Sequence, residues 1–339
     1  MKRGLLVLAM CVALIGVGAQ AQAAYKKQVL NAATASPLIG PYGQIVEKFK
    51  TSLEELSGGA ITVKNLSGGA LGDEQANVKQ LRSQELHMSV LFAGNLSPFS
   101  PVVTVFNLPY LFPEIEDCFA LFGNKEFMGK VNEIVTKQAG VRPLGWAISS
   151  YRHLTNSKHP VKNINDLQGL KIRVSPAEVQ LESFRAWGVD PHPLAWTEVF
   201  NALQQRVVDG QENPYATNAD QKFWEIQKYT TELHYMLWIG PILVSEAWYQ
   251  KQDDATKEII NKAAEAAANY GTEILQKLAQ TAKQACLDHG MIIDVLEDEQ
   301  VWIDKARARW PKFYDSIGDK ALVDEAVDIV EKARAARKK

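Results

Sequence analysis

The sequence is poor in the residues from which metal sites and redox sites are usually built. Among its 339 residues it has three cysteines and six histidines. Cys11, Cys118 and Cys286 form no CxxC pair, which excludes the common zinc and redox motifs. No histidine lies at metal-ligand spacing from another, so we expect neither a bound metal nor a cofactor.

Motifs typical of enzymes are also missing from the sequence. It contains no GxSxG turn, no GxxxxGKS/T phosphate loop and no HExxH helix. A catalytic triad that only the fold assembles stays open at this point, but no pattern favours one. We therefore do not expect an enzyme.

The charge of the chain has no strong sign. Lys and Arg number 37 against 39 Asp and Glu, which gives a formal net charge of −2. Nucleic-acid binding requires a clustered basic face, and nothing in the sequence indicates one. The basic run KARAARKK at the C-terminus predicts a solvated helix end.

The longest hydrophobic run lies at the N-terminus. Lys2 and Arg3 precede an apolar run over residues 5–17, and Ala21-Gln22-Ala23 supplies the small-x-small pattern of a signal-peptidase site. Because a membrane span needs about 20 apolar residues, we expect a cleaved signal peptide over residues 1–23. A retained membrane anchor is the alternative. Cleavage predicts a soluble chain exported to the periplasm.

The cysteines do not indicate a disulfide framework. Cleavage would remove Cys11, which no convincing lipoprotein box precedes. Cys118 and Cys286 would enter an oxidising compartment, where they either pair or stay free. Their sequence separation does not decide between the two.

The exported chain, at more than 300 residues, is long for one hydrophobic core and predicts two domains. Strand and helix patterns alternate in the first half, which predicts an α/β fold with a largely parallel sheet. In that half we expect strands at 27–33, 59–63 and 87–91 and helices at 40–56 and 73–82. After Gly140 we expect strands at 141–148, 170–174, 235–238 and 242–245, and helices at 176–187 and 196–205. Ser175 is expected to cap the first of these helices, with Pro176 as its first residue.

One expected helix is unusually long. Residues 254–289 contain no proline and keep an apolar stripe at helical spacing. At 1.5 Å per residue this helix would extend about 54 Å, longer than one small lobe. A pair of helices broken near Gly271 is the alternative.

Two segments resemble a known family. Trp196 to Pro214 reads WTEVFNALQQRVVDGQENP and Asp166 to Val174 reads DLQGLKIRV. Both resemble signatures of the solute-binding subunits of TRAP (tripartite ATP-independent periplasmic) transporters, the C4-dicarboxylate-binding-like family. FNLPYLFP and KFWEIQKYTTELH elsewhere are similar to further family segments. Gln205-Arg206 departs from the small Thr-Gly often found before VVDG.

The strand pattern alone gives Arg173 no special role. Leu170, Ile172 and Val174 share one face of the strand, so Arg173 points away from it and would most often be a surface charge. The resemblance implies a different role, a paired salt bridge from Arg173 to the carboxylate of the ligand. A guanidinium presents two parallel N–H donors that match the two oxygens.

The resemblance also implies other binding residues. Arg152, in SSYRHLTNSKHP, would be a second cationic contact, with a surface arginine as the alternative, while its neighbour His153 is expected to be a structural or surface histidine. Asn213 in DGQENP would contact the ligand, with a turn asparagine as the alternative. Gln211 and Glu212 would hold the loop.

Further residues would form the walls of the site. Trp196 is expected either to stack on the ligand or to pack in the core. Glu74 would accept hydrogen bonds from ligand hydroxyls, or would simply favour the N-terminus of its helix. Phe92, Tyr215 and Trp238 are possible pocket walls.

The resemblance implies a two-lobed periplasmic binding protein fold with a hinge and a long lobe-spanning helix. We expect lobe 1 at residues 25–148 plus 239–278 and lobe 2 at 149–238 plus 279–339. The implied function is capture of a small organic acid and its delivery to the small and large TRAP membrane subunits. We expect the chain to be a monomer. A ligand-sensing receptor subunit and a binding protein for an ABC-type transporter are alternatives. The ligand could be a C4-dicarboxylate, a sugar acid, a 2-oxo acid or an aromatic acid; Trp196 slightly favours a ring.

Overall fold

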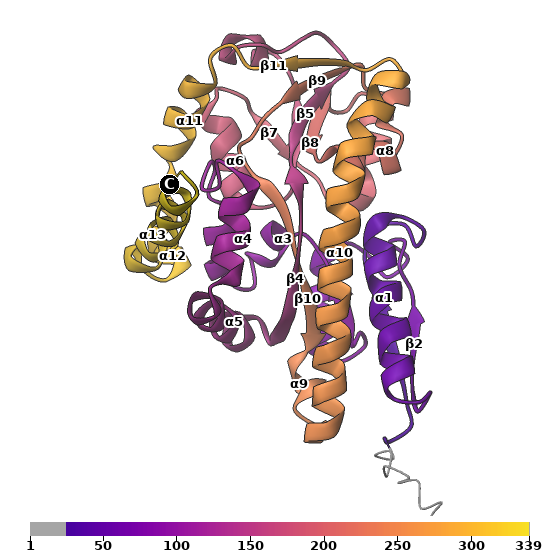
Figure 1. The fold of residues 1–339 in the computed structure, drawn as a ribbon. Coiled ribbons are helices and arrows are strands. Elements are labelled where there is room, and N and C mark those ends of the chain that lie inside the picture. Colours follow the sequence, from indigo (N-terminus) through magenta and orange to yellow (C-terminus); the bar gives the residue numbers. More distant parts are fainter. Residues whose placement is uncertain (1–24, 339) are drawn as a thin grey trace, which may run out of the picture.

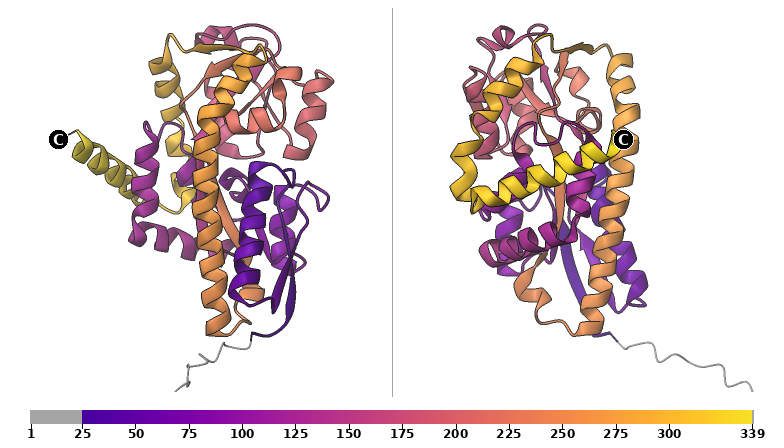
Figure 2. Two further views of the ribbon diagram at one scale, coloured as in Figure 1. Left: turned by 45° about the vertical axis from the view of Figure 1, so that its right-hand side comes forward. Right: turned by 60° about the vertical axis from the view of Figure 1, so that its left-hand side comes forward.

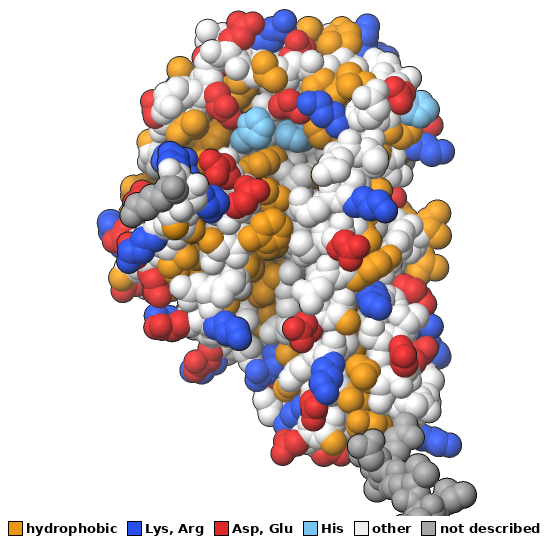
Figure 3. All heavy atoms as spheres, viewed as in Figure 1, with side chains coloured by type: hydrophobic (Ala, Val, Ile, Leu, Met, Phe, Trp, Pro, Cys, Tyr) orange, Lys and Arg blue, Asp and Glu red, His pale blue; other side chains and the backbone are white. Residues whose placement is uncertain are grey.

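The computed structural model describes residues 25–338. The expected signal peptide over residues 1–23, with Cys11, lies outside the described residues. Within residues 25–338, no helix combines the length and apolar character that crossing a membrane would require. Positive and negative side chains are interspersed over both halves of the face in Figure 3.

Two mixed sheets form the two halves of the molecule (Figure 1). The first has the order β2-β1-β3-β10-β4, with bounds Ile61–Asn65, Gln28–Ala33, Met88–Val90, Leu237–Ser245 and Val141–Tyr151. β1 runs parallel to β2 and β3, but β10 is antiparallel to β3 and β4. The expected parallel arrangement therefore holds only for the three N-terminal strands.

The second sheet has the order β11-β9-β5-β8-β6-β7. Its strands are Ile292–Val295, Tyr229–Glu232, His153–Asn156, Gly210–Asn213, Ile172–Val174 and Pro191–Pro193. β5 is antiparallel to β8 and β9, whereas β6 is parallel to β7 and β8. The long strands β4 and β10 lead from the first half toward the second (Figure 1), and Arg152 alone separates β4 from β5.

Short helices connect and cover the strands. In the first half they are α1 (Pro41–Leu56), α2 (Glu74–Ser83), α3 (Ala93–Leu96), α4 (Ile115–Gly123) and α5 (Lys125–Ala139). In the second they are α6 (Glu178–Ala186), α7 (Val199–Gln204) and α8 (Tyr215–Asp220). α9 (Glu246–Tyr249) follows β10 and packs in the first half, against α2, β4 and β10. Single 3-10 turns lie at Pro101–Asn107, Ile164–Leu167, Trp196–Glu198, Phe223–Glu225 and Trp310–Phe313.

Local chemistry explains where α1 and α2 begin. α1 begins at Pro41, whose missing N–H costs nothing at the first helical position. Its residues Ile45 and Phe49 are completely buried, since they face the core at helical spacing. α2 begins after Asp73, whose carboxylate accepts a hydrogen bond from the backbone N of Ala76 at 2.7 Å. This cap fixes Glu74 as the first helical residue.

The expected helix at 176–187 begins later than its sequence pattern predicts. α6 starts at Glu178 with Ala177 as its N-cap, so the predicted cap at Ser175 is wrong. The backbone N of Ala177 donates to the carbonyl of Ser175 at 2.7 Å, which makes a tight turn through Pro176 instead. The turn leaves Ser175 at the end of β6. The expected helix at 196–205 is a 3-10 turn followed by α7.

The long helix is confirmed as one unbroken element. α10 runs from Asp254 to Asp288, 35 residues, along both halves of the molecule (Figures 1 and 2). It packs against α1 and β4 in the first half and against α8 in the second. Asp253 caps its start by accepting from the backbone N of Thr256 at 2.7 Å. Gly271 does not break it.

Of the C-terminal helices, α11 (Glu299–Arg307) packs against α6 in the second half, whereas α12 (Tyr314–Ile317) and α13 (Lys320–Arg337) lie against the first half. α13 packs against α4 (Figure 2), and Arg337 contacts both Glu114, at 3.1 Å, and Asp117. Residues 335–338 at the end of α13 are exposed, so the predicted solvated helix end is confirmed, although Arg337 also pairs with two acids of the first half. The division of the chain into lobes stays a prediction.

The two cysteines in the described part of the chain do not pair. Cys118 lies on α4 and Cys286 on α10, and both are buried and free. Burial raises the pKa of both thiols, so neither is a reactive thiolate at neutral pH.

Candidate functional site

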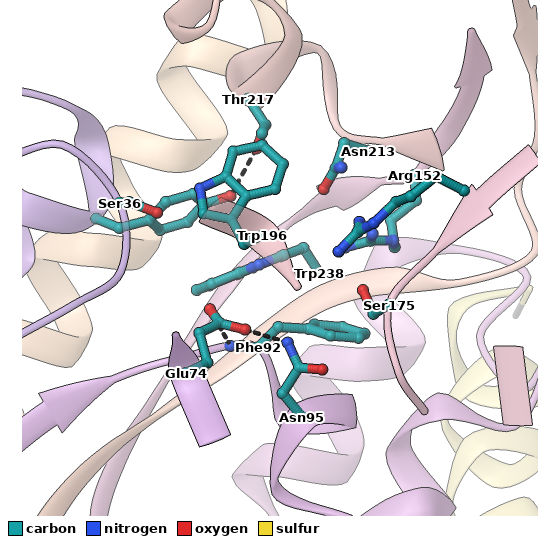
Figure 4. A pocket seen from close by; sticks show the side chains of 12 residues that line it. Ser36, Glu74, Phe92, Asn95, Arg152, Ser175, Trp196, Asn213, Thr217 and Trp238 are labelled. Atoms are coloured by element: carbon teal, nitrogen blue, oxygen red, sulfur yellow. Dashed lines mark hydrogen bonds between the residues drawn. The ribbon is translucent and has the colours of Figure 1, made fainter. Parts of the chain in front are cut away.

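A pocket with about 320 Å³ of open space lies where the two halves of the molecule meet (Figure 4). Side chains from both halves and from β10 line it. They are Ser36, Tyr42, Glu74, Phe92, Asn95, Arg152, Arg173, Ser175, Trp196, Asn213, Thr217 and Trp238. Charged, amide, hydroxyl and aromatic groups therefore converge on one cavity.

Arg152 occupies the junction between β4 and β5 and is 1% exposed. Its Nε lies 2.5 Å from Glu212 Oε2 and its Nη2 lies 2.8 Å from Oε1, so the two side chains form a bidentate ion pair. Gln180 and Tyr235 also donate to the Glu212 carboxylate, at 2.9 and 2.6 Å. Burial lowers the pKa of Arg152, but the charge of Glu212 outweighs burial and the pKa lies above its ordinary value.

Arg173, in the middle of β6, is equally buried at 1% exposure but has a different partner. Its Nε and Nη2 donate to the backbone oxygen of Leu194, at 3.0 and 2.6 Å, and within residues 25–338 it forms no ion pair. Burial, followed by repulsion from Arg152, lowers its pKa to about 10. Arg173 therefore remains charged at neutral pH without a bound counter-ion.

The surface position that the strand pattern alone favours for Arg173 is wrong. Ile172 and Val174 are completely buried on one face of β6, and Arg173 is buried on the other. β6 lies between β7 and β8 inside the sheet, and the pocket covers the face that carries Arg173. Alternation identifies which face the side chain occupies but not what covers that face.

Glu74 enters the pocket from the first half. Its carboxylate accepts a hydrogen bond from the backbone N of Phe92 at 3.1 Å and another from the side-chain amide of Asn95. Burial raises the pKa of Glu74, while these two bonds oppose the shift. Figure 4 shows Glu74 and Asn95 on one side of the pocket and Arg152 on another.

Aromatic side chains form the walls between these polar groups. Trp238 stacks on Tyr42, with ring centroids 4.3 Å apart. The guanidinium of Arg152 lies 4.6 Å from the ring centroid of Phe92, and that of Arg173 lies 6.0 Å from Trp196. The hydroxyls of Tyr42 and Thr217 are 2.9 Å apart, a hydrogen bond that joins α1 to α8 across the pocket.

The structure brings together seven of the eight residues expected from sequence. Arg173, Arg152, Asn213, Trp196, Glu74, Phe92 and Trp238 all line the pocket. Asn213 donates its side-chain amide to Gln211 at 2.5 Å, which fixes its orientation at the end of β8.

Tyr215 is placed elsewhere. It does not line the pocket: its ring packs on His153, with centroids 4.5 Å apart, and its hydroxyl donates to Glu232 at 3.1 Å. α8 begins at Tyr215, and the helical turn presents Thr217 to the pocket instead. His153 is buried, as expected for a structural histidine.

Sequence reasoning missed five lining residues: Ser36, Tyr42, Asn95, Ser175 and Thr217. A signal existed for two of them. Ser36 and Ser175 follow the parallel strands β1 and β6, and ligands in α/β proteins bind at the carboxyl ends of such strands. Asn95 and Thr217 lie on helices of four and six residues, which no periodicity reveals.

Comparisons with known proteins show the family of this chain. Residues 32–316 match the family described as bacterial extracellular solute-binding protein, family 7. The sialic acid-binding periplasmic protein SiaP of Vibrio cholerae is 31% identical over 225 residues, which cover 66% of this chain and 70% of that protein.

Solved structures give the same result. A TRAP periplasmic solute-binding protein from Rhodobacter sphaeroides, in an apo, open and partially disordered form, is 36% identical with a TM-score of 0.74, covering 90% of this chain and 99% of that one. The sugar acid binding protein DctPAm from Advenella mimigardefordensis, in complex with galactonate, is 25% identical with a TM-score of 0.86, covering 91% and 99%.

Fold and pocket together define a two-lobed periplasmic binding protein with a hinge and a long helix that spans both lobes. The chain belongs to bacterial extracellular solute-binding protein family 7, the family of TRAP transporter solute-binding subunits. Proteins of this family are periplasmic and bind solutes rather than act as enzymes. Within residues 25–338, no cluster of side chains suited to hold a metal ion is present.

Proposed function

We propose that this chain captures a small organic acid in the periplasm and delivers it to the small and large membrane subunits of a TRAP transporter. The ligand carboxylate binds Arg173, and Arg152 and Asn213 complete the polar contacts. Cleavage of the signal peptide after residue 23 releases the chain as a monomer. The observation that carries this proposal is the buried guanidinium of Arg173, which has a backbone carbonyl as its partner instead of a carboxylate.

The physical argument concerns compensation of charge. A cation buried without an anion is unfavourable, so proteins normally pair it. Arg152 already has Glu212, whereas Arg173 gains a counter-ion only when an anion enters the pocket. An entering carboxylate therefore meets a fixed, partly dehydrated donor. Its binding also removes an unfavourable feature of the empty protein.

Arg173→Gln tests the proposal. We expect a folded protein whose affinity for its organic acid falls by about 3–5 kcal/mol, roughly 150-fold to several thousand-fold. Because the substitution removes an uncompensated buried charge, the ligand-free protein should melt no lower than wild type. Isothermal titration calorimetry measures the affinity, and a thermal-shift screen of organic acids identifies the ligand beforehand.

Arg142→Gln is the matched control. Arg142 forms an ion pair with Glu246 at 2.6 Å and does not line the pocket. Its loss should leave the affinity within a few-fold of wild type. If Arg173→Gln also binds within a few-fold of wild type, the role assigned to Arg173 is wrong.

A further inference from the structure

The two arginines of the pocket do not offer two positive charges to a ligand. Glu212 compensates Arg152 through the bidentate pair, and its remaining contacts to Gln180 and Tyr235 hold it in that position. Within the described residues, Nη1 of Arg152 makes no hydrogen bond, so the side chain can still donate one. Only Arg173 supplies a net positive charge to the cavity.

The part of the pocket formed by the first half presents acceptors. Glu74 has a buried carboxyl group with two donors already in place, and a carboxylate accepts further hydrogen bonds. The side-chain oxygen of Asn95 is buried and has no partner within residues 25–338. An acceptor that lacks a donor in the protein is satisfied by a hydroxyl of the ligand. A ligand carboxylate, which has no donor, would meet Glu74 as a like charge.

We infer that this pocket selects a monocarboxylate that carries hydroxyl groups away from its carboxylate, and rejects the dicarboxylate of the same length. The carboxylate of the ligand binds Arg173, and its hydroxyls bind Glu74 and Asn95. This inference rests on the proposed function and specifies the charge of its ligand.

The aromatic walls are consistent with this ligand. Trp196, Trp238 and Phe92 offer flat apolar surfaces to the carbon chain or ring of a polyhydroxylated acid, while Ser36 and Ser175 add hydroxyls. The pocket provides no third guanidinium or ammonium group for a second carboxylate. A buried carboxylate without a cation is strongly disfavoured, so we expect a discrimination of at least about 100-fold.

Calorimetry with matched acids tests the inference. The ligand-free mature protein is titrated with galactonate and galactarate, which differ only in the oxidation state of one terminal carbon, and with the four-carbon pair threonate and tartrate. Tighter binding of the monoacid of a pair, by at least about 100-fold, supports the inference. Equal or tighter binding of the diacid overturns it and leaves the proposed function intact. The proposed function fails separately, if no organic acid of the thermal-shift screen binds the protein.

Glu74→Gln tests the acceptor side directly. Glutamine can still accept from the backbone N of Phe92, so the fold is retained while the charge is lost. We expect the preference for monoacid over diacid to shrink by at least about tenfold, because the repulsion of the second carboxylate is removed. An unchanged preference would overturn the role of Glu74. Glu182→Gln is the control, since Glu182 is also buried but pairs with Lys312 and Arg185 outside the pocket, and its loss should leave the preference unchanged.

Discussion

Arg152 and Arg173 have the same side chain and the same burial, yet their surroundings shift their pKa values in opposite directions. Glu212 raises the pKa of Arg152 above its ordinary value, whereas burial and repulsion lower the pKa of Arg173 to about 10. The first arginine is therefore a structural ion pair that also borders the pocket. The second is a buried cation that can bind an anion.

The Arg152–Glu212 pair should behave as one unit in folding. Arg152→Gln and Glu212→Gln each leave the opposite charge buried and unpaired, so each should reduce the free energy of unfolding by about 3–5 kcal/mol. The double variant should lose clearly less than the sum, because it leaves no uncompensated charge. Urea denaturation of the four proteins measures the interaction energy. Additive losses would show that the pair does not act as a unit.

His153, next to Arg152 in sequence, is a buried neutral histidine. It is 5% exposed, its Nδ1 has no partner within residues 25–338, and burial lowers its pKa to about 3. The ionisable groups that face it are Glu232, His234 and Lys283, of which Glu232 opposes the shift. The unfolded chain therefore takes up a proton at His153 near pH 6.5, while the folded chain does not until about pH 3.

This difference predicts a pH dependence of stability. Between pH 6.5 and 3 the unfolded state binds more protons at His153, so the free energy of unfolding falls as pH falls, by at most about 1.4 kcal/mol per unit. The lowered pKa of Glu232 has the same sign, but acts only below the ordinary value of a glutamate, 4.5. The raised pKa of His234 contributes stability that is complete below pH 6.5 and is lost above it. Between pH 6 and 5 the lowered pKa of His87 adds a dependence of the same sign, and the raised pKa values of Glu74 and Asp220 oppose it, so the share of His153 is isolated only by comparing a His153 variant with wild type.

His153→Gln should flatten the dependence in that interval. Urea unfolding at pH 6 and pH 5 gives the slope, and the difference between variant and wild type cancels every other titrating group. His159→Gln, at a half-buried histidine outside this cluster, is the control and should keep the wild-type slope. An identical slope in His153→Gln and wild type would show that His153 is protonated in the folded protein.

At the residue scale, the sequence predicts which residues border the pocket but not which residues they pair with. The family signatures predict that Arg152, Arg173 and Asn213 border the site, and all three line the pocket. Sequence does not reveal that Glu212, expected only to hold the loop, is the counter-ion of Arg152. The partners are 60 positions apart, and the pairing depends on the register of β5 against β8. Register is a tertiary property that a local pattern does not contain.

At the scale of elements, long periodic patterns are predicted well and short ones poorly. The apolar stripe of α10 predicts 35 helical residues nearly to the residue. The start of α6 is misplaced, because Pro176 suits both a helix start and a tight turn, and the carbonyl of Ser175 selects the turn. β10 passes unbroken through Pro241, which propensity alone predicts as an interruption.

Gly271 shows why α10 contains a glycine. A Cβ at this position would lie 2.7 Å from Cδ1 of Ile45 and 3.1 Å from Cβ of Ala147, so the missing side chain lets α10 approach α1 and β4 closely. Gly271→Val should lower the free energy of unfolding by about 1–3 kcal/mol through overpacking. In an Ile45→Ala background, which removes the obstructing atoms, the loss should be smaller.

Gly129→Val is the control for that prediction. Gly129 lies inside helix α5, and a Cβ there would meet no atom within 4 Å. Valine is the better helix former by a few tenths of a kcal/mol, so this variant should be neutral or slightly stabilised. Urea denaturation of both variants compares them. A Gly271→Val protein as stable as Gly129→Val would contradict close packing at Gly271.

At the scale of the whole molecule, the arrangement of the two halves matches a ligand-bound relative. Similarity to the galactonate complex, at a TM-score of 0.86, exceeds similarity to the open apo relative, at 0.74, although the latter is more identical in sequence and equally covered. The hydrogen bond between Tyr42 and Thr217 crosses the boundary between the two halves, which we call the seam. If the described arrangement is the closed one, ligand binding selects it, and a substitution that disturbs this contact should weaken binding.

A close contact at this seam allows closure to be perturbed without touching the pocket. Gly40 precedes α1 in the first half, and a Cβ there would lie 2.8 Å from Oδ1 of Asp220 at the end of α8. Neither residue lines the pocket. The backbone of Gly40 is extended, with φ −72° and ψ 169°, which valine adopts without strain, also before Pro41. In the described arrangement Gly40 therefore lies directly against Asp220.

Gly40→Val should therefore weaken ligand binding by about tenfold, or ~1.4 kcal/mol, while the ligand-free protein melts as wild type. Asp220→Ala in the same chain removes the obstructing carboxylate and should restore the affinity. Calorimetry measures binding, and small-angle X-ray scattering measures the decrease in radius of gyration that accompanies closure. Because both substitutions avoid the pocket, a loss that Asp220→Ala reverses has to arise from closure of the lobes. An affinity that Gly40→Val leaves unchanged, or that Asp220→Ala does not restore, would show that this seam stays apart when ligand binds.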